Sequence, residues 1–98
     1  MRAEVQKYLK TVNVRSLQTN TQRALYRLLT SNGWVSNRSF RIPSASRRIR
    51  DLRSEQYGSF EVECRSAISL EKKGDAYTFY YRLNQDSVTL GRVRRVFG

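Results

Sequence analysis

The stretch SASRRIRDLRSEQYG, residues 44–58, decides the fold of this 98-residue chain. Its apolar positions are spaced for a helix, because at about 100° per residue they fall on one stripe, formed by Ala45, Ile49, Leu52 and the stem of Gln56. The opposite face carries Arg47, Arg50, Asp51 and Ser54. The step from Ile42 to Pro43 favours an extended approach, the hydroxyl of Ser44 can cap the first free N–H groups, and Gly58 supplies a left-handed exit. We therefore expect a helix from Ala45 to Tyr57.

An arginine-rich amphipathic helix has two interpretations. It is either a solvated surface helix, whose charges keep the protein in solution, or a helix that reads DNA. Arg48 and Arg53 flank the apolar stripe, which suits side chains that brace the helix and contact phosphate. Asp51 is expected to pair with Arg47, four residues earlier, or with Arg48, three residues earlier. The stretch alone does not separate the two interpretations, so the rest of the chain has to decide.

The charge of the chain points to a polyanionic partner. It has 19 Lys and Arg residues against 8 Asp and Glu residues, a formal net charge of +11. The excess is uneven: residues 1–53 hold twelve basic and two acidic side chains, residues 54–87 are net −2, and residues 88–98 are net +3. Charge concentrated in this way predicts an affinity for nucleic acid that falls as the salt concentration rises.

The composition argues against an enzyme. There is no His, and the single Cys64 can form neither an internal disulfide nor a zinc site. A hydrolytic triad, His-based acid–base chemistry, metal catalysis and a cofactor are therefore not expected. We interpret Cys64 as a small strand residue that packs inward. The sequence shows neither an apolar run of about 18 residues nor a signal-peptide segment, so we expect a cytoplasmic protein.

A helix is predicted ahead of the arginine-rich one. Thr19 and Gln22 have the spacing of a capping box, and Asn32 with Gly33 provides the stop. Between them lies an apolar stripe formed by Leu25, Leu28 and Leu29. We expect this helix to span residues 20–31.

A short second helix is predicted in WVSNRSF, residues 34–40. Ser36 can cap one turn that runs through Arg38 to Phe40, and the residues expected to be buried here are Trp34, Val35 and Phe40. Arg23 and Arg27, on the preceding helix, are interpreted as a solvated face. The order helix, short helix, turn, helix is that of a helix-turn-helix with a compressed middle element.

After Gly58 the pattern changes from helical to alternating, which predicts strands. One face of the first strand holds Phe60, Val62 and Cys64, and one face of the second holds Tyr77, Phe79, Tyr81 and Leu83. The turn signal KKGD predicts a hairpin with Lys72 and Lys73 at its tip. We assign the aromatic residues to core and wing packing, because base-stacking platforms are basic and these strands are not. The expected fold class is α+β, a winged helix-turn-helix with a three-helix core and a two-stranded β-hairpin wing.

The two ends of the chain fall outside this pattern. Residues 1–18 are expected to form an N-terminal arm or a short helix, with VNVRSL as a short strand. Residues 84–98 are expected to be a basic C-terminal tail or a small added strand, in which Val93 and Val96 lie among three arginines. The winged domain itself is expected to span residues 19–83.

These elements resemble the compact winged helix-turn-helix domains common among small bacteriophage and prophage proteins. The segments that carry the resemblance are TQRALYRLL, NGWVS, IPSASRRIRDLR, QYG, FEVECR and YYRL, in this order between Thr19 and Leu83. The resemblance implies binding of double-stranded DNA through the helix that carries Arg47 and Arg50. The chain departs from the family pattern in its very short second helix and in the basic segments at both ends.

We expect DNA contacts of two kinds. Arg47 and Arg50 are the candidates for base edges in the major groove, because a bidentate Arg to guanine is the commonest specific contact. Secondary candidates are Ser46 and Ser54. Phosphate contacts are assigned to Arg38, Arg41, Ser44, Arg53, Lys72 and Lys73. Contacts that lengthen the footprint along the backbone or enter the minor groove are assigned to Arg92, Arg94 and Arg95.

The sequence therefore predicts a sequence-preferring double-stranded DNA-binding protein of a phage or mobile element, acting in the host cell cytoplasm or nucleoid. Its expected role is to regulate transcription or to assist recombination or replication. Two alternatives stay open: a winged-helix module that binds a host protein, and an RNA-binding protein. Homodimerisation or higher assembly on DNA through the terminal segments also stays open, and no membrane or metal partner is expected.

Overall fold

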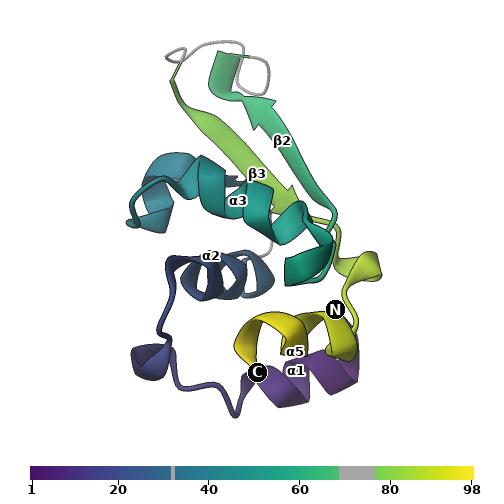
Figure 1. The fold of residues 1–98 in the computed structure, drawn as a ribbon. Helices are drawn as coiled ribbons and strands as arrows, with labels where there is room; N and C mark the ends of the chain where they lie inside the picture. The colour runs from purple at the N-terminus through teal and green to yellow at the C-terminus, as the bar shows by residue number, and fades with distance from the viewer. Residues whose placement is uncertain (32, 69–76) are drawn as a thin grey trace.

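Helices and a small antiparallel sheet build the fold (Figure 1). The computed structural model describes residues 1–31, 33–68 and 77–98. Within these ranges the α-helices are α1 (Ala3–Leu9), α2 (Asn20–Leu29), α3 (Ala45–Arg53) and α5 (Leu90–Phe97). The strands are β1 (Val35–Ser36), β2 (Val62–Ser66) and β3 (Phe79–Leu83). Short 3₁₀ turns are η1 (Val14–Ser16), η2 (Asn37–Phe40), η3 (Glu55–Tyr57) and η4 (Gln85–Ser87). The expected α+β class is confirmed.

The capping box predicted for α2 is present. Thr19 Oγ1 accepts a hydrogen bond from the backbone N–H of Gln22 at 3.1 Å, and Gln22 Oε1 accepts one from the backbone N–H of Thr19 at 3.2 Å. The predicted apolar stripe is buried, with Leu25 fully inside. The helix ends at Leu29, two residues earlier than expected, and Thr30 is its C-cap.

The short second helix is also confirmed, as the 3₁₀ turn η2. Ser36 Oγ accepts a hydrogen bond from the backbone N–H of Ser39 at 3.2 Å, as a capping serine does. Val35 and Phe40 are buried as predicted, but Trp34 is only half-buried. The reason is strand alternation: because Val35 points into the core, its neighbour Trp34 lies on the other face of the sheet.

The sheet has a third strand that the sequence did not indicate. The strand order is β1-β3-β2, with both pairs antiparallel, so β3 is central and Val35 of β1 lies opposite Tyr81. β1 is two residues long, too short for alternation to be visible in the sequence. Cys64 of β2 is exposed, so the prediction of an inward cysteine is wrong. β2 is an edge strand that, together with β3, rises beyond α3 (Figure 1), and Cys64 is exposed at this edge although its partner Tyr81 on the central strand is buried.

The arginine-rich helix α3 starts at Ala45 as predicted but ends at Arg53, four residues early. Ser54 adopts an extended conformation (φ −77°, ψ 153°) that breaks the helix, and the chain continues as the 3₁₀ turn η3. Gln56 therefore does not continue the apolar stripe and is exposed. The exit at Gly58 is left-handed as predicted, with φ 102°.

Ser44 occupies the N-cap position of α3 without capping it. Its side chain makes no hydrogen bond to the helix, which contradicts the predicted cap. Side-chain caps require extended backbone at this position, whereas Ser44 is left-handed, with φ 52° and ψ 50°. The chain therefore enters the helix through the left-handed backbone conformation of Ser44, without a cap from its hydroxyl group.

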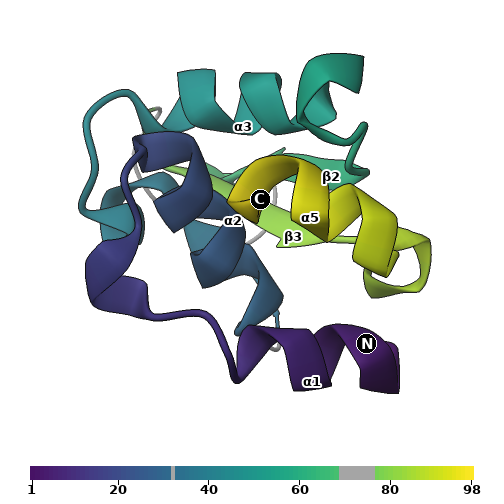
Figure 2. The same ribbon diagram turned by 60° about the horizontal axis from the view of Figure 1, so that its bottom comes forward.

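The ends of the chain are helical and belong to the same core. Val5 of α1 is fully buried, which agrees with the helical alternative for residues 1–18. Residues 90–97 form α5, so the expectation of a tail or strand there is wrong. Val93 and Val96, three residues apart, lie on one helical face and are buried. The stretch VNVRSL contains η1 instead of the expected strand. Figure 2 shows α1 on the side of α2 away from α3, and α5 beside α2.

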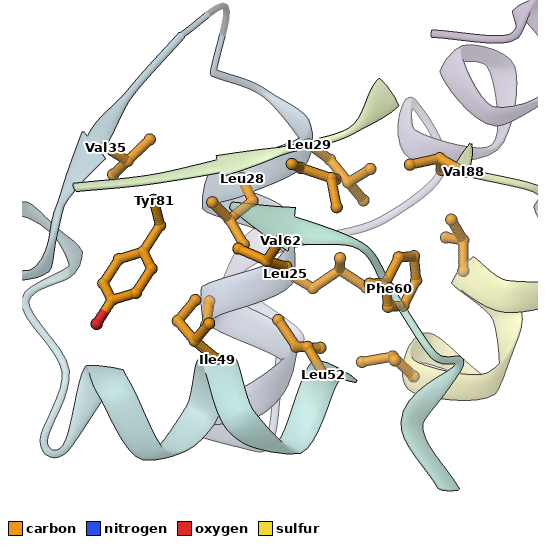
Figure 3. Close-up of a cluster of buried hydrophobic side chains, with 14 of the residues drawn as sticks. Leu25, Leu28, Leu29, Val35, Ile49, Leu52, Phe60, Val62, Tyr81 and Val88 are labelled. Atoms are coloured by element: carbon orange, nitrogen blue, oxygen red, sulfur yellow. The ribbon is translucent and has the colours of Figure 1, made fainter. Parts of the chain in front are cut away.

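One hydrophobic core fixes the orientation of α3 (Figure 3). Buried side chains of α2, α3, the sheet and the segment that leads into β2 point toward one another there: Leu25, Leu28, Ile49, Leu52, Phe60, Val62 and Tyr81. Burial of Ala45, Ile49 and Leu52, the apolar residues of the stripe predicted for α3, is thus confirmed. Because this inner face is packed against both α2 and the sheet, the outer face of α3 is held toward solvent.

Candidate nucleic-acid interface

The outer face of α3 presents two free guanidinium groups. Arg47 and Arg50 are exposed and lie three residues apart, so they share one side of the helix. Within the described ranges, neither side chain makes a hydrogen bond or an ion pair. Both groups can therefore turn to an external acceptor without first breaking an internal contact.

The other two arginines of α3 are engaged with the protein itself. Arg48 Nε lies 3.4 Å from Asp51 Oδ2, which selects Arg48 from the two partners expected for that carboxylate. Arg53 donates from Nε at 3.2 Å and from Nη2 at 2.6 Å to the backbone carbonyl of Val62. The two bonds from Arg53 tie the C-terminal part of α3 to β2. Only the remaining N–H donors of Arg53 are therefore available for a phosphate.

The two serines named as secondary contacts both have partners. Ser46 Oγ and Tyr81 Oη are 2.8 Å apart and share a hydrogen bond. Ser54 Oγ donates to the backbone carbonyl of Asp51 at 2.6 Å. A hydroxyl has one donor and two acceptor positions, so Ser46 keeps at least one position for an external group. Ser54 has used its donor and keeps only acceptor positions.

The N-terminal end of α3 is flanked by three of the predicted phosphate contacts. Arg41 and Ser44 are exposed and both left-handed, with φ 54° and 52°. Arg38 is exposed on η2, and its Nε donates to Thr78 Oγ1 at 3.0 Å. This bond joins η2 to the residue just before β3. The structure thus brings these three residues to the turn that leads into α3.

The arginines of α5 do not form one surface. Arg95 Nη1 donates to the carbonyl of Glu55 at 2.8 Å, and Arg92 Nη1 donates to the carbonyl of Ser87 at 3.1 Å. Both line a pocket of about 430 Å³ beside Gly58, just beyond the C-terminal end of α3. Arg94 lies elsewhere, with its guanidinium 5.5 Å from the ring centroid of Tyr8 on α1.

The opposite face of the sheet is electrically balanced. Arg82 Nη2 donates to Glu63 Oε2 at 2.9 Å, and the Arg82 guanidinium lies 4.5 Å from the ring centroid of Trp34. Arg65 approaches the same ring at 5.8 Å. Sequence reasoning treated Trp34 as a core residue and missed this arrangement. The signal was the alternation that places Glu63, Arg65 and Arg82 on one face of the hairpin.

Tyr81 contacts the arginine-rich helix in a way that the sequence did not indicate. It was predicted only to pack, and its ring is indeed buried against Phe40, with ring centroids 6.2 Å apart. Its hydroxyl, however, reaches Ser46 at the start of α3, and Figure 3 shows the ring directed from β3 toward that helix. Alternation places Tyr81 inward, but nothing local to the sequence identifies its partner 35 residues away.

The predicted contacts Lys72 and Lys73, at the expected tip of the hairpin, lie outside the described residues. Among the residues that are described, no helix is long and apolar enough to cross a membrane. The same part of the chain contains no group of three or more His, Cys, Asp or Glu side chains placed to hold a metal ion. Comparisons with models of protein families, with curated proteins and with solved structures found no match for this chain.

Proposed function

We propose that this protein binds double-stranded DNA with a preference for certain sequences, and that α3 reads the major groove. The observation that carries the proposal is that two of the four arginines of α3 have internal partners and two have none in the described structure. Arg47 and Arg50 are exposed without an internal partner in the described structure, whereas Arg48 pairs with Asp51 on the same helix and Arg53 bonds to the carbonyl of Val62. The major groove admits an α-helix, and a free guanidinium can donate two bonds to O6 and N7 of guanine.

In this proposal the molecule is a winged helix-turn-helix domain. α2, η2 and α3 form the helix-turn-helix, and β2 with β3 forms the wing. The support for the wing is that both strands rise beyond α3 (Figure 1), where they can reach an adjacent stretch of backbone. Arg38, Arg41 and Ser44 contact phosphate at one end of α3, and Arg92 with Arg95 contacts it at the other. The biological role we propose is regulation of transcription, or assistance to recombination or replication, in a phage or mobile element.

The experiment that tests base reading compares single-charge deletions. Sequences bound by the wild-type protein are selected from a random duplex pool, and Arg47→Ala and Arg50→Ala are measured on the selected site and on random duplex. Lys7→Ala is the matched control, because it removes one exposed positive charge from α1, away from α3. We expect each α3 variant to lose about 1 to 3 kcal/mol on the selected site and to relax base choice, while Lys7→Ala changes neither.

Two outcomes would contradict the proposal. If all three variants weaken binding to selected and random duplex by the same factor, α3 makes no base-specific contact. If the affinity for duplex DNA is unchanged between low and physiological salt, the expected release of counterions from the phosphates does not occur. Competition with structured RNA and with single strands, measured in the same assay, separates duplex DNA binding from RNA binding.

A further inference from the structure

A pocket of about 340 Å³ lies on the surface of the molecule between η1, α2 and the turn that leads into α3. Its lining is largely apolar: Val14, Leu17, Tyr26, Phe40 and Ile42. Leu17 and Phe40 are buried at 7 % and 8 % exposure and form its floor, whereas Val14 is 50 % exposed at its edge. We call this site the α2 pocket. It is open to solvent, and its volume lies at the lower end of the range for ligand pockets. A pocket of this size suits one or two anchoring side chains better than a large cofactor.

The rim of the α2 pocket has a single sign of charge. Arg23, Arg27 and Arg41 line it, and among the described residues no acidic side chain does. Arg23 is held in place, because Nη2 donates to the carbonyl of Leu17 at 2.8 Å and Nη1 donates to Asn20 Oδ1 at 3.0 Å. Arg27 and Arg41 are exposed, and their guanidinium groups make neither a hydrogen bond nor an ion pair in the described part of the chain. Carboxylate and phosphate oxygens both match the geometry of such guanidinium groups.

An apolar floor and a basic rim define the chemistry of the occupant. Exposed arginines alone would suit phosphate, but a duplex presents a rigid backbone that cannot place an apolar group on Phe40 and Leu17. A peptide that alternates apolar and acidic side chains satisfies both parts at once, since an apolar anchor fills the pocket while carboxylates meet Arg27 and Arg41. We propose that the α2 pocket binds an acidic, amphipathic peptide segment of a partner protein. This inference does not depend on DNA binding by α3.

The probe that tests the pocket is a short fluorescent peptide in which glutamate alternates with leucine and phenylalanine. Two further peptides serve as controls: one with serine at every apolar position, and one with lysine at every glutamate. Binding to the full chain is measured by anisotropy, and we expect saturable binding of the first peptide only. Val14→Ser removes an exposed apolar contact and Arg27→Glu reverses one rim charge, and because both residues are at the surface neither change should disturb folding, which circular dichroism checks.

We expect Arg27→Glu to weaken the peptide complex by about tenfold or more, through loss of a charge-assisted hydrogen bond. Val14→Ser should weaken it measurably, while Arg47→Ala and Arg50→Ala on α3 should leave it unchanged. The proposal is overturned if the serine peptide binds as well as the original, because the attraction is then only electrostatic. It is equally overturned if Val14→Ser has no effect on binding of the peptide.

Discussion

Substitution of Gly58 by Ala provides a sharp test of how the chain leaves the arginine-rich helix. Gly58 is buried and has φ 102°, and a Cβ built there would lie 2.9 Å from the backbone oxygen of Arg92 and 2.9 Å from Cε2 of Phe60. Left-handed backbone costs a residue with a side chain about 1 to 2 kcal/mol. Crowding of a packed interior costs about 1 to 3 kcal/mol more, because Phe60 is 2 % exposed and the carbonyl belongs to helix α5. We therefore expect Gly58→Ala to lower the free energy of unfolding by about 2 to 5 kcal/mol.

The assay is urea and thermal unfolding followed by circular dichroism, with Gly91→Ala as the matched control. Gly91 lies in the first turn of α5, and a Cβ added there meets no atom within 4 Å. Alanine is the better helix former, so Gly91→Ala should stabilise the protein by up to about 1 kcal/mol. A loss of 2 kcal/mol at Gly58 corresponds to a midpoint about 8 to 16 °C lower. If both variants unfold at the wild-type midpoint, or if Gly91→Ala is the more damaging, the packing of Gly58 against α5 is not as described.

Three further substitutions test other contacts. Val93→Ala should cost about 2 kcal/mol in urea unfolding because this side chain is fully buried. Arg94→Ala, exposed on the same helix, should cost at most about 1 kcal/mol, the size of its cation–π contact with Tyr8, and equal effects would show that α5 is not part of the core. Thr19→Ala removes the capping box of α2 and should cost about 1 kcal/mol by the same measurement, and an unchanged midpoint would contradict the cap. Tyr81→Phe should cost about 1 kcal/mol, and a double-mutant cycle with Ser46→Ala should return a coupling of similar size; a coupling near zero would mean that the hydrogen bond contributes nothing to stability.

The parts of the fold that the sequence predicted are those determined by near neighbours in the chain. Thr19 and Gln22 are three residues apart and close the capping box between themselves. The same holds for Ser36, which caps η2 through Ser39, and for the left-handed exit at Gly58. The stripe of α3 was predicted because helical periodicity repeats within the segment. In each case the interaction that fixes the structure spans only a few residues.

The predictions that were wrong concern the end of α3, Cys64 and residues 90–97. At these positions the structure depends on contacts between residues that are far apart in the sequence. The break at Ser54 is accompanied by a backbone bond from Phe60 to Leu52, which turns the chain toward β2 before a longer helix could form. Cys64 lies opposite the buried Tyr81, yet it is exposed on an edge strand, and the order of the strands depends on pairing between distant segments. Residues 90–97 were expected as a tail because three arginines dominate their composition. The spacing of Val93 and Val96, three residues apart, indicated a helix. Whether these valines are buried depends on how α5 packs against the rest of the core.

At the candidate site, the structure distinguishes arginines that already make internal hydrogen bonds from arginines that make none. An arginine that already donates to a carbonyl, as Arg53 does to Val62, can exchange that bond for one to phosphate only at the cost of loosening α3. In the proposed complex Arg47 and Arg50 face no such exchange within the described structure, so a contact with DNA there breaks no internal hydrogen bond. Base choice should therefore respond most to these two positions, while removal of Arg53 should weaken binding to every sequence by misplacing the helix. Stability measured beside affinity distinguishes the two effects, because only the Arg53 variant should lose both.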